Sequence, residues 1–381
     1  MQKPLGIYLH IPFCRSKCPY CDFYSLTDVG LADAYTDALC EELRTLSRVS
    51  PFVPPVIKER PVDTVYFGGG TPSYFGAERL TRILNAVKED FRVAENAEIT
   101  VECNPSSSSP ELFHALKENG VNRISLGMQS AVDSERRGLG RTAGRDVLTS
   151  AVSSCREAGI DNISLDMMLG IPGQTAESLE YSLDFALSLG VPHISAYMLK
   201  IEEGTYFYKK RNSLSLPDDD LTADMYEFMS AYLREKGMRH YEISNFCFGD
   251  KYSRHNVKYW LLDDYLGIGA AAHSFVDGQR FYFPRSLKAF TGGEKAVFDC
   301  TGGGADEYIM LSLRLDTGLS LSELKNRFSL LPDGSFHEKI KEWERRSLVT
   351  FDGDRLALTP SGFLVSNSLI IDAAASFGLG V

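Results

Sequence analysis

Hydrophobic and polar residues follow a regular order along the first half of the chain. Short β-type runs occur at residues 6–11, 63–70, 98–105, 122–130, 162–172 and 193–200. The segments between them carry apolar residues at helical spacing, as in residues 31–49, where Tyr35, Leu39 and Leu43 fall on one face. Strands that alternate with helices predict a parallel sheet with right-handed crossovers. We therefore expect an α/β fold, a partial (β/α)6 barrel.

After about residue 205 this alternation stops and a different pattern begins. The expected elements are a helix over residues 217–237, a strand over 240–246, a loop and sheet edge over 252–275, helices over 319–328 and 336–349, and a hairpin over 349–359 that turns at Asp352–Gly353. The last part is typical of a small winged-helix-like α+β domain. We expect a barrel domain over residues 1–285, a linker over 286–304 and a C-terminal domain over 305–381.

Composition and charge narrow the class of protein. The chain has 381 residues, 44% of them hydrophobic and 24% charged, as in ordinary globular proteins. The formal net charge of −11 argues against a nucleic-acid partner, which normally requires a basic face. No apolar run reaches the roughly 18 residues of a membrane helix, and the interrupted N-terminal residues do not resemble a signal peptide. We expect a cytoplasmic protein that is not an integral membrane protein.

Three of the eight cysteines lie close together directly after the first predicted strand. Cys14, Cys18 and Cys21 have the spacing C-x3-C-x2-C, whereas the other five have no ligand spacing and are expected to pack as small apolar residues. A structural zinc site would need a fourth ligand, for which His10 is the nearest candidate. An iron–sulfur cluster takes thiolate ligands. With three protein ligands, a four-iron cluster keeps one iron open for another molecule.

The cysteine spacing, with the aromatic Tyr20 before the last cysteine, resembles the signature of the radical S-adenosylmethionine (SAM) superfamily. The resemblance implies a 4Fe-4S cluster held by the three cysteines, with SAM on the open iron. The segment Gly69, Gly70 and Thr71 after the second strand resembles the glycine-rich segment of these proteins. Glycine there lets the backbone approach SAM closely.

The order of polar residues at the strand ends resembles a narrower group, the oxygen-independent coproporphyrinogen III oxidases and their relatives. The resemblance implies that SAM is contacted by residues matching Tyr8, Tyr20, Gly69, Gly70, Thr71, Glu102, Gln129, Arg141 and Asp166. The residue types suit this role. Carboxylates accept hydrogen bonds from an ammonium group or ribose hydroxyls, and an arginine can hold a carboxylate with two parallel hydrogen bonds.

Two features depart from the oxidases themselves. The oxidase pattern carries a fourth cysteine where this chain has Phe23, and only thirteen residues precede Cys14 here. Both departures match the radical SAM haem chaperones of the HemW type, which are also marked by the motif H-N-x-x-Y-W. This chain reads HNVKYW, and the resemblance implies haem contacts for His255, Asn256, Tyr259 and Trp260. Histidine is a common axial ligand of haem iron, and the aromatic rings offer flat apolar surfaces.

We therefore expect a haem chaperone that binds haem, SAM and a 4Fe-4S cluster and delivers haem to acceptor proteins, with respiratory haem enzymes at a membrane as candidate acceptors. His255 is expected on a mobile loop, from which it could exchange haem. One alternative is a coproporphyrinogen III decarboxylase, in which a radical abstracts hydrogen from a propionate side chain. Another is a radical SAM enzyme acting on RNA, which the acidic balance disfavours. Whether the chain is an enzyme stays open at this point.

Overall fold

The computed structural model describes residues 3–380 of the chain. Contacts within the described residues divide them into two compact units. The first contains the residues up to Asp218 together with Asp263–Thr301, and the second contains Asp219–Leu262 and the residues from Gly302 onward. Residues 219–262 are thus grouped with the C-terminal part of the chain, whereas the boundaries expected from the sequence group them with the barrel.

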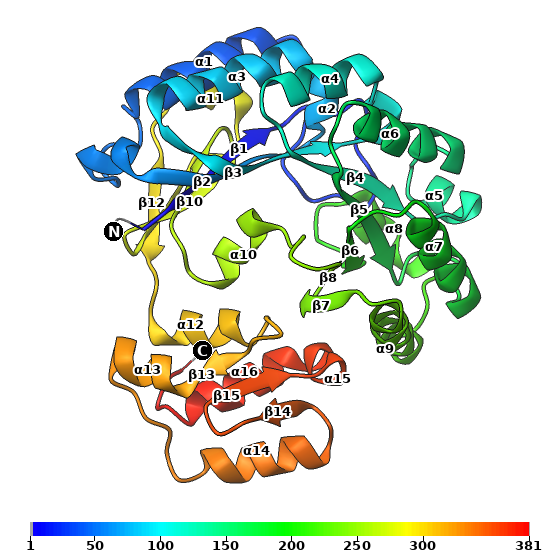
Figure 1. The fold of residues 1–381 in the computed structure, drawn as a ribbon, viewed down its shortest axis with the longest axis vertical. Coiled ribbons are helices and arrows are strands. Elements are labelled where there is room, and N and C mark those ends of the chain that lie inside the picture. The colour runs from blue at the N-terminus through cyan, green and yellow to red at the C-terminus, as the bar shows by residue number, and fades with distance from the viewer. Residues whose placement is uncertain (1–2, 381) are drawn as a thin grey trace. The chain divides into compact units, whose positions relative to one another are not determined.

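A mainly parallel sheet is the centre of the first unit (Figure 1). Its parallel strands are β1 (Leu5–Ile11), β2 (Pro61–Gly69), β3 (Arg92–Cys103), β4 (Arg123–Gln129), β5 (Asn162–Leu169) and β6 (His193–Met198), each paired with the next. All six strands expected from the sequence are confirmed. Because every crossover returns through a helix, the carboxyl ends of these strands lie along one edge of the sheet.

The other side of β1 carries an extension of this sheet. Strand β9 (Tyr265–Ile268) pairs with β1 in parallel, and β10 (His273–Val276), β11 (Gln279–Tyr282) and β12 (Val297–Thr301) follow in antiparallel order. The sheet edge expected within residues 252–275 is thereby confirmed. The segment 286–304 is more ordered than a linker, because it contains helix α11 (Leu287–Thr291) and strand β12.

Helices pack along one face of this sheet (Figure 1). The longer ones are α1 (Ala32–Thr45), α3 (Ala77–Asp90), α4 (Pro110–Glu118), α6 (Arg145–Glu157) and α7 (Ala176–Ser188), and the shorter ones α2 (Pro72–Phe75) and α5 (Asp133–Gly138). Helix α8 (Tyr206–Lys210) lies elsewhere, where the Phe207 N–H donates to the Pro19 oxygen at 2.9 Å. The expected apolar face of α1 is buried, including Tyr35, Leu39 and Leu43. Apolar contacts of this kind, at roughly 25 cal/mol per Å² of buried apolar surface, hold the helices to the sheet.

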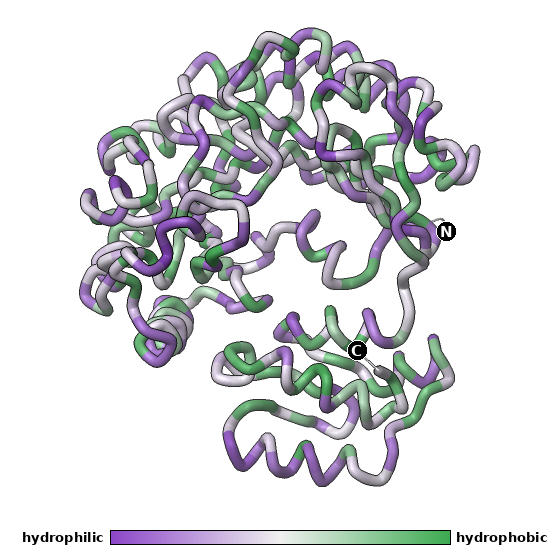
Figure 2. The backbone as a smooth tube through the Cα atoms, turned by 180° about the vertical axis from the view of Figure 1, so that it is seen from behind, coloured by the Kyte–Doolittle hydropathy of each residue, from purple (hydrophilic) through white to green (hydrophobic). Residues whose placement is uncertain are grey.

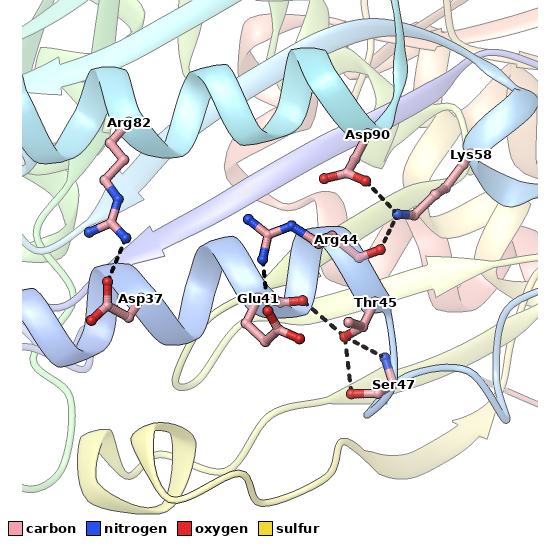
Figure 3. A network of polar contacts seen from close by, with 8 residues as sticks. All are labelled: Asp37, Glu41, Arg44, Thr45, Ser47, Lys58, Arg82 and Asp90. Carbon is pink, nitrogen blue, oxygen red and sulfur yellow. Dashed lines mark hydrogen bonds and ion pairs between the residues drawn. The ribbon is translucent and has the colours of Figure 1, made fainter.

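Polar contacts at the surface of α1 and α3 add little to this packing (Figure 3). Arg82 of α3 lies 2.6 Å from Asp37 of α1, but both side chains are more than half exposed. Lys58 bridges the Asp90 carboxylate, at 3.1 Å, and the Arg44 carbonyl oxygen. Exposed ion pairs contribute at most about 1 kcal/mol each. The alignment of the two helices is therefore set by their buried faces.

The second unit combines a helix, a hairpin and the C-terminal elements. These are α9 (Asp219–Glu235), β7 (Arg239–Glu242), β8 (Asn245–Cys247), α10 (Arg254–Trp260), α12 (Ala305–Ser312), β13 (Leu319–Ser320), α13 (Leu321–Phe328), α14 (Phe336–Arg345), β14 (Val349–Phe351), β15 (Arg355–Leu358), α15 (Pro360–Leu364) and α16 (Ser366–Ala375). Strands β13, β15 and β14 form a small antiparallel sheet. The predicted helix over 217–237, the two C-terminal helices and the hairpin at Asp352–Gly353 are all present.

Polar and apolar residues alternate along the helices of this unit (Figure 2). In α14 the buried residues Phe336, Ile340 and Trp343 recur at helical spacing, and the residues between them are mostly exposed. One face of α14 is therefore buried along its length, and the opposite face is exposed. No helix in residues 3–380 is long and apolar enough to cross a membrane.

Two sequence expectations in this unit were wrong. Residues 240–246 do not form one strand, because the chain turns at Ile243 and Ser244 and makes the antiparallel hairpin β7–β8. The turn is held by a hydrogen bond of 2.7 Å from the Tyr226 hydroxyl to the Ile243 carbonyl oxygen. The HNVKYW segment is not a loop, since it forms helix α10. Its β-branched and aromatic residues have low helix propensity, so here tertiary contacts override the local preference.

Candidate functional site

The three cysteines lie on the loop that connects β1 with α1. The base of this loop is closed by two backbone hydrogen bonds, from the Cys14 N–H to the Leu26 oxygen at 2.9 Å and from the Leu26 N–H to the Pro12 oxygen at 2.7 Å. Within the loop, the Cys21 N–H donates to the Cys18 oxygen at 3.2 Å. All three cysteines are free thiols and partly exposed. The loop thus presents three thiols at the carboxyl end of the first strand.

The donor set suits an iron–sulfur cluster. Partial burial raises the pKa of the Cys21 thiol, and ligation by iron would supply the positive charge that favours the thiolate. The Thr71 hydroxyl donates a hydrogen bond of 3.3 Å to the Cys14 sulfur. Within residues 3–380 no group of three or more His, Cys, Asp or Glu side chains is gathered tightly around a single-ion site. A four-iron cube is larger than one ion, so its ligands stand further apart.

His10 is not available as a fourth ligand. Its Nε2 lies 2.9 Å from the Tyr24 carbonyl oxygen, which can only accept, so this nitrogen carries the hydrogen. Its Nδ1 then accepts from the Tyr8 hydroxyl at 3.1 Å. Burial lowers the pKa of His10 to about 4 and keeps the ring neutral. His10 therefore links the cysteine loop to the first strand as a structural residue.

Close packing within the protein already requires glycine at positions 69 and 70. Gly69 has a φ of +106°, and a Cβ there would meet the His10 ring. A Cβ on Gly70 would lie 2.7 Å from the Ile11 oxygen and 2.9 Å from the Phe13 nitrogen. The Gly70 N–H donates to the Ile11 oxygen at 2.8 Å. The glycines let the end of β2 lie directly against the end of β1.

Glu102 ends β3 beside this segment. The Tyr66 hydroxyl donates to its Oε1 at 2.8 Å, and the Gly69 N–H donates to its Oε2 at 3.2 Å. Burial raises the pKa of Glu102 to about 7 despite these hydrogen bonds. Tyr66, which sequence reasoning missed, also stacks on the predicted site residue Tyr8, with ring centroids 6.2 Å apart. Its position two residues before Gly68, on the same face of the strand, was the available signal.

Asp166 on β5 lies in a second polar group. The Ser125 hydroxyl lies 2.8 Å and 3.0 Å from its two carboxylate oxygens. Burial raises the pKa of Asp166. Ser125 is directly opposite Glu102 in the register of β3 and β4, and Asp166 lies two residues beyond the partner of Ser125 on β5. The two acidic residues therefore share one face of the sheet, with β4 between them. Sequence reasoning missed Ser125 as well, since a serine within a strand carries no distinctive pattern.

Gln129, Arg141 and Tyr20 are brought together at the end of β4. Gln129 has a φ of +65°, unusual for a residue other than glycine, where the β4–β5 register shifts. A Cβ on Gly127 would lie 3.1 Å from the Gln129 amide nitrogen and 3.7 Å from the Arg141 guanidinium. Arg141 in turn donates to the Tyr20 hydroxyl at 2.9 Å and 3.2 Å. Arg141 thus joins the cysteine loop to the ends of the strands.

The HNVKYW segment lies in the second unit. His255 is fully buried, and its Nε2 lies 2.8 Å from the hydroxyl of Tyr259, one helical turn further on. Asn256, Tyr259 and Trp260 are partly exposed. The Arg314 guanidinium lies 5.8 Å from the centroid of a Trp260 ring. The helix therefore holds the histidine inward and presents part of its aromatic residues outward.

Two protein-family models and several curated relatives match the chain. Residues 8–186 match the model of the Radical SAM superfamily, and residues 305–365 match that of the HemN C-terminal domain. The chain is 34% identical to a protein named heme chaperone HemW from Lactococcus lactis, over 97% of each chain. A protein of the same name from Bacillus subtilis is 34% identical, over 95% of this chain and 97% of the relative.

A solved structure shows the same fold. The coproporphyrinogen III oxidase HemN from Escherichia coli, a radical SAM enzyme, superposes with a TM-score of 0.82, over 99% of this chain and 91% of that one. The two sequences are 23% identical. The expected α/β architecture with its C-terminal domain is therefore confirmed.

Proposed function

This chain belongs to the HemW heme chaperone family of radical SAM proteins, and we propose that it binds haem and delivers it to haem-dependent acceptor proteins. The two relatives carry the same name, and each matches this chain over nearly its full length, which supports this function. The motif HNVKYW, with the expected haem contacts His255, Asn256, Tyr259 and Trp260, also supports it. We further propose that it works in the cytoplasm, where respiratory enzymes at the membrane are candidate acceptors.

The first unit supplies a place for the cluster and SAM. Cys14, Cys18 and Cys21 would hold the 4Fe-4S cluster, since all three are free and lie on one closed loop. Glu102 and Asp166 would accept hydrogen bonds from SAM, and Arg141 and Gln129 would hold its polar groups from the neighbouring strand end. When bound, a reduced cluster in proteins of this class supplies an electron for cleavage of the SAM sulfonium. The chain's own residues position the two cofactors beside each other.

The second unit supplies His255 as the proposed haem ligand. Its Nε2 is held by the Tyr259 hydroxyl, so haem iron would have to replace that hydrogen bond. A neutral hydroxyl hydrogen bond contributes only about 0.5–1.5 kcal/mol, which an iron–nitrogen bond can exceed. Trp260 and Tyr259 would pack against the porphyrin with their exposed faces. The buried histidine thus has a partner that it can exchange for iron.

The test compares His255→Ala with His114→Ala, which removes an exposed histidine of α4. After anaerobic reconstitution with iron and sulfide, His255→Ala should bind haem more weakly and show an altered haem absorption spectrum. Its iron content and SAM binding should equal those of wild type, because the change lies in the other compact unit. The His114→Ala protein should behave as wild type throughout.

Two results would contradict the proposal. One is a His255→Ala protein with the wild-type haem spectrum and undiminished haem transfer to an apo-acceptor. The other is a wild-type protein that removes carboxylate from coproporphyrinogen and binds no haem, which would favour the oxidase reaction instead.

A further inference from the structure

A cavity of about 410 Å³ opens in the first unit next to the cysteine loop. One wall is the segment from Tyr24 to Leu31, which follows Cys21, and the other is the segment from Arg285 to Lys288 at the start of α11. The Leu287 N–H donates to the Tyr24 hydroxyl at 2.6 Å and joins the two walls. The volume is within the usual range of small-molecule sites.

More of the cavity surface is apolar than polar. Leu26, Leu31 and Leu287 make the floor apolar, and Leu31 is 40% exposed although it is a large aliphatic residue. Apolar walls of this kind favour a flat hydrophobic ligand over a hydrated ion. The cavity does not contain any of the residues assigned above to the cluster or to SAM.

The charges at this cavity are unusual for so acidic a protein. Arg285 and Lys288 line it, and both are exposed, in a chain whose net charge is −11. Asp28 is the only acidic residue among the lining residues, and one of its oxygens accepts from the Gly30 N–H at 2.8 Å. Arg285 also donates to the Asp22 backbone oxygen at 2.8 Å and lies 3.9 Å from the Asp22 carboxylate, which leaves Lys288 as the main source of positive charge at the rim. The cavity thus joins an apolar floor to a locally positive rim.

We propose that this cavity binds the carboxylate-bearing edge of a porphyrin, with Lys288 and Arg285 facing the two propionates and the leucines packing on the ring. This inference deepens the proposed haem function and rests on it for the choice of ligand. A porphyrin dicarboxylate is a flat apolar molecule with two negative charges at one edge, which is the complement of this cavity. Charge complementarity of this kind also steers an anionic ligand to its site.

The chemistry of the lining residues separates this site from His255. Among residues 3–380, no histidine, cysteine or methionine lines the cavity, and Tyr24 already accepts a hydrogen bond through its hydroxyl. The site would therefore recognise the ring and its carboxylates rather than the iron. It follows that a porphyrin without metal should bind here as well as haem does, and that His255 should not be needed for this binding.

The experiment measures the fluorescence of metal-free protoporphyrin during titration with the reconstituted full-length protein. Lys288→Glu reverses one rim charge and should weaken binding about threefold to tenfold. Leu31→Asp places a charge on the apolar floor, yet aspartate is favoured at the N-cap of α1, so the helix should keep its start. The matched controls are Lys341→Glu and Leu331→Asp, which alter an exposed lysine and an exposed leucine of the second unit.

The outcomes separate this inference from the haem proposal. We expect weaker porphyrin binding in both cavity variants. We expect unchanged binding in the two controls and in His255→Ala. Equal affinity of wild type, Lys288→Glu and Leu31→Asp would overturn the cavity as a porphyrin site, while haem binding at His255 could still stand. If porphyrin binds through Lys288 but haem never changes its spectrum through His255, the cavity stands and the chaperone proposal fails. Iron content verifies the fold of the first unit in the two cavity variants, and far-UV circular dichroism verifies the fold of the variants in the second unit.

Discussion

Burial leaves the Glu102 carboxyl half protonated near neutral pH, because its pKa is raised to about 7. Its two hydrogen-bond donors, Tyr66 and Gly69, favour the ionised form but do not fully offset the loss of water. A carboxylate that must accept from the ammonium group of SAM has to be ionised when SAM is bound. In the proposed SAM site, binding of SAM would therefore be coupled to release of a proton from this residue.

This coupling predicts a pH dependence of SAM affinity. Because the free carboxyl has the raised pKa, the ionised form gains population as pH rises from about 6 to about 8, and SAM affinity of the reconstituted protein should rise with it. Glu102→Gln should bind SAM roughly tenfold or more weakly at pH 8 and with a flatter pH profile. Anaerobic calorimetric titration at several pH values measures both effects.

The control for this prediction is Glu111→Gln, at an exposed position in the first turn of α4. It should keep the wild-type profile. Asp166 also has a raised pKa and is retained in both variants, so some pH dependence is expected to persist. A Glu102→Gln protein whose affinity rises with pH as steeply as that of wild type would show that another group releases the proton.

Among the elements, the hairpin β7–β8 supports the helix that carries the HNVKYW segment. The hydroxyl of Tyr241 on β7 accepts from the backbone N–H of Ser253, the N-cap residue of α10, at 3.1 Å. Both residues are buried. The first N–H groups of a helix have no partner within it, so a side-chain acceptor at this point stabilises the helix start.

Tyr241→Phe should lower the free energy of unfolding of the second unit by about 1–3 kcal/mol, because it leaves a buried N–H without its acceptor. Both tryptophans of the chain, Trp260 and Trp343, belong to this unit, so tryptophan fluorescence during urea unfolding reports on it directly. Tyr206→Phe, at an exposed tyrosine of the first unit, is the matched control. Superimposable unfolding curves for Tyr241→Phe and wild type would rule out this support.

The elements also show what the sequence could and could not reveal. The six parallel strands were predictable because buried strands alternate with amphipathic helices, and the cysteine loop was predictable from spacing alone. Helix α10 was not, since Val257, Tyr259 and Trp260 favour strand locally and only packing makes them helical. The turn at Ile243 was missed because it lacks glycine and proline, and its contact with Tyr226 is non-local.

The candidate site could be predicted only in part, because some of its residues are brought together by non-local contacts. Glu102 and Asp166 were identified by resemblance at the ends of strands, and the structure places them on β3 and β5 of one face, with β4 between them. The donors that hold them, Tyr66 and Ser125, come from other strands and are defined only by the sheet register. The deep burial of His255 likewise depends on the tertiary structure.

At the scale of the whole molecule, the second unit is built from two separate stretches of chain. Backbone hydrogen bonds of 3.0 Å join Ile243 to Arg314 and Asp316 to Tyr241, and Arg239 pairs with Asp316 at 2.6 Å. His240 also lies 5.4 Å from Phe363 between ring centroids. Residues 219–262 and the C-terminal residues therefore share one core.

A shared core predicts cooperative opening. In native-state hydrogen exchange with rising denaturant, amides of α9 and α10 should merge into one opening reaction with those of α12 and α16, because removing either stretch exposes the buried surface of the other. Mass spectrometry of peptic fragments gives the opening free energy of each segment. If α10 instead opens together with β1–β6, the boundaries expected from the sequence, with residues 1–285 as one domain, describe the molecule better.

The discontinuous second unit also limits how this family can exchange parts. A recombination event or a designed chimera that joins at residue 301 would bring in a foreign C-terminal module and leave the native residues 219–262 behind. The new unit would then combine two stretches of chain that did not evolve together, and the side chains in its core would pack poorly. Productive grafts should therefore carry residues 219–262 and the C-terminal residues together, as one paired transplant.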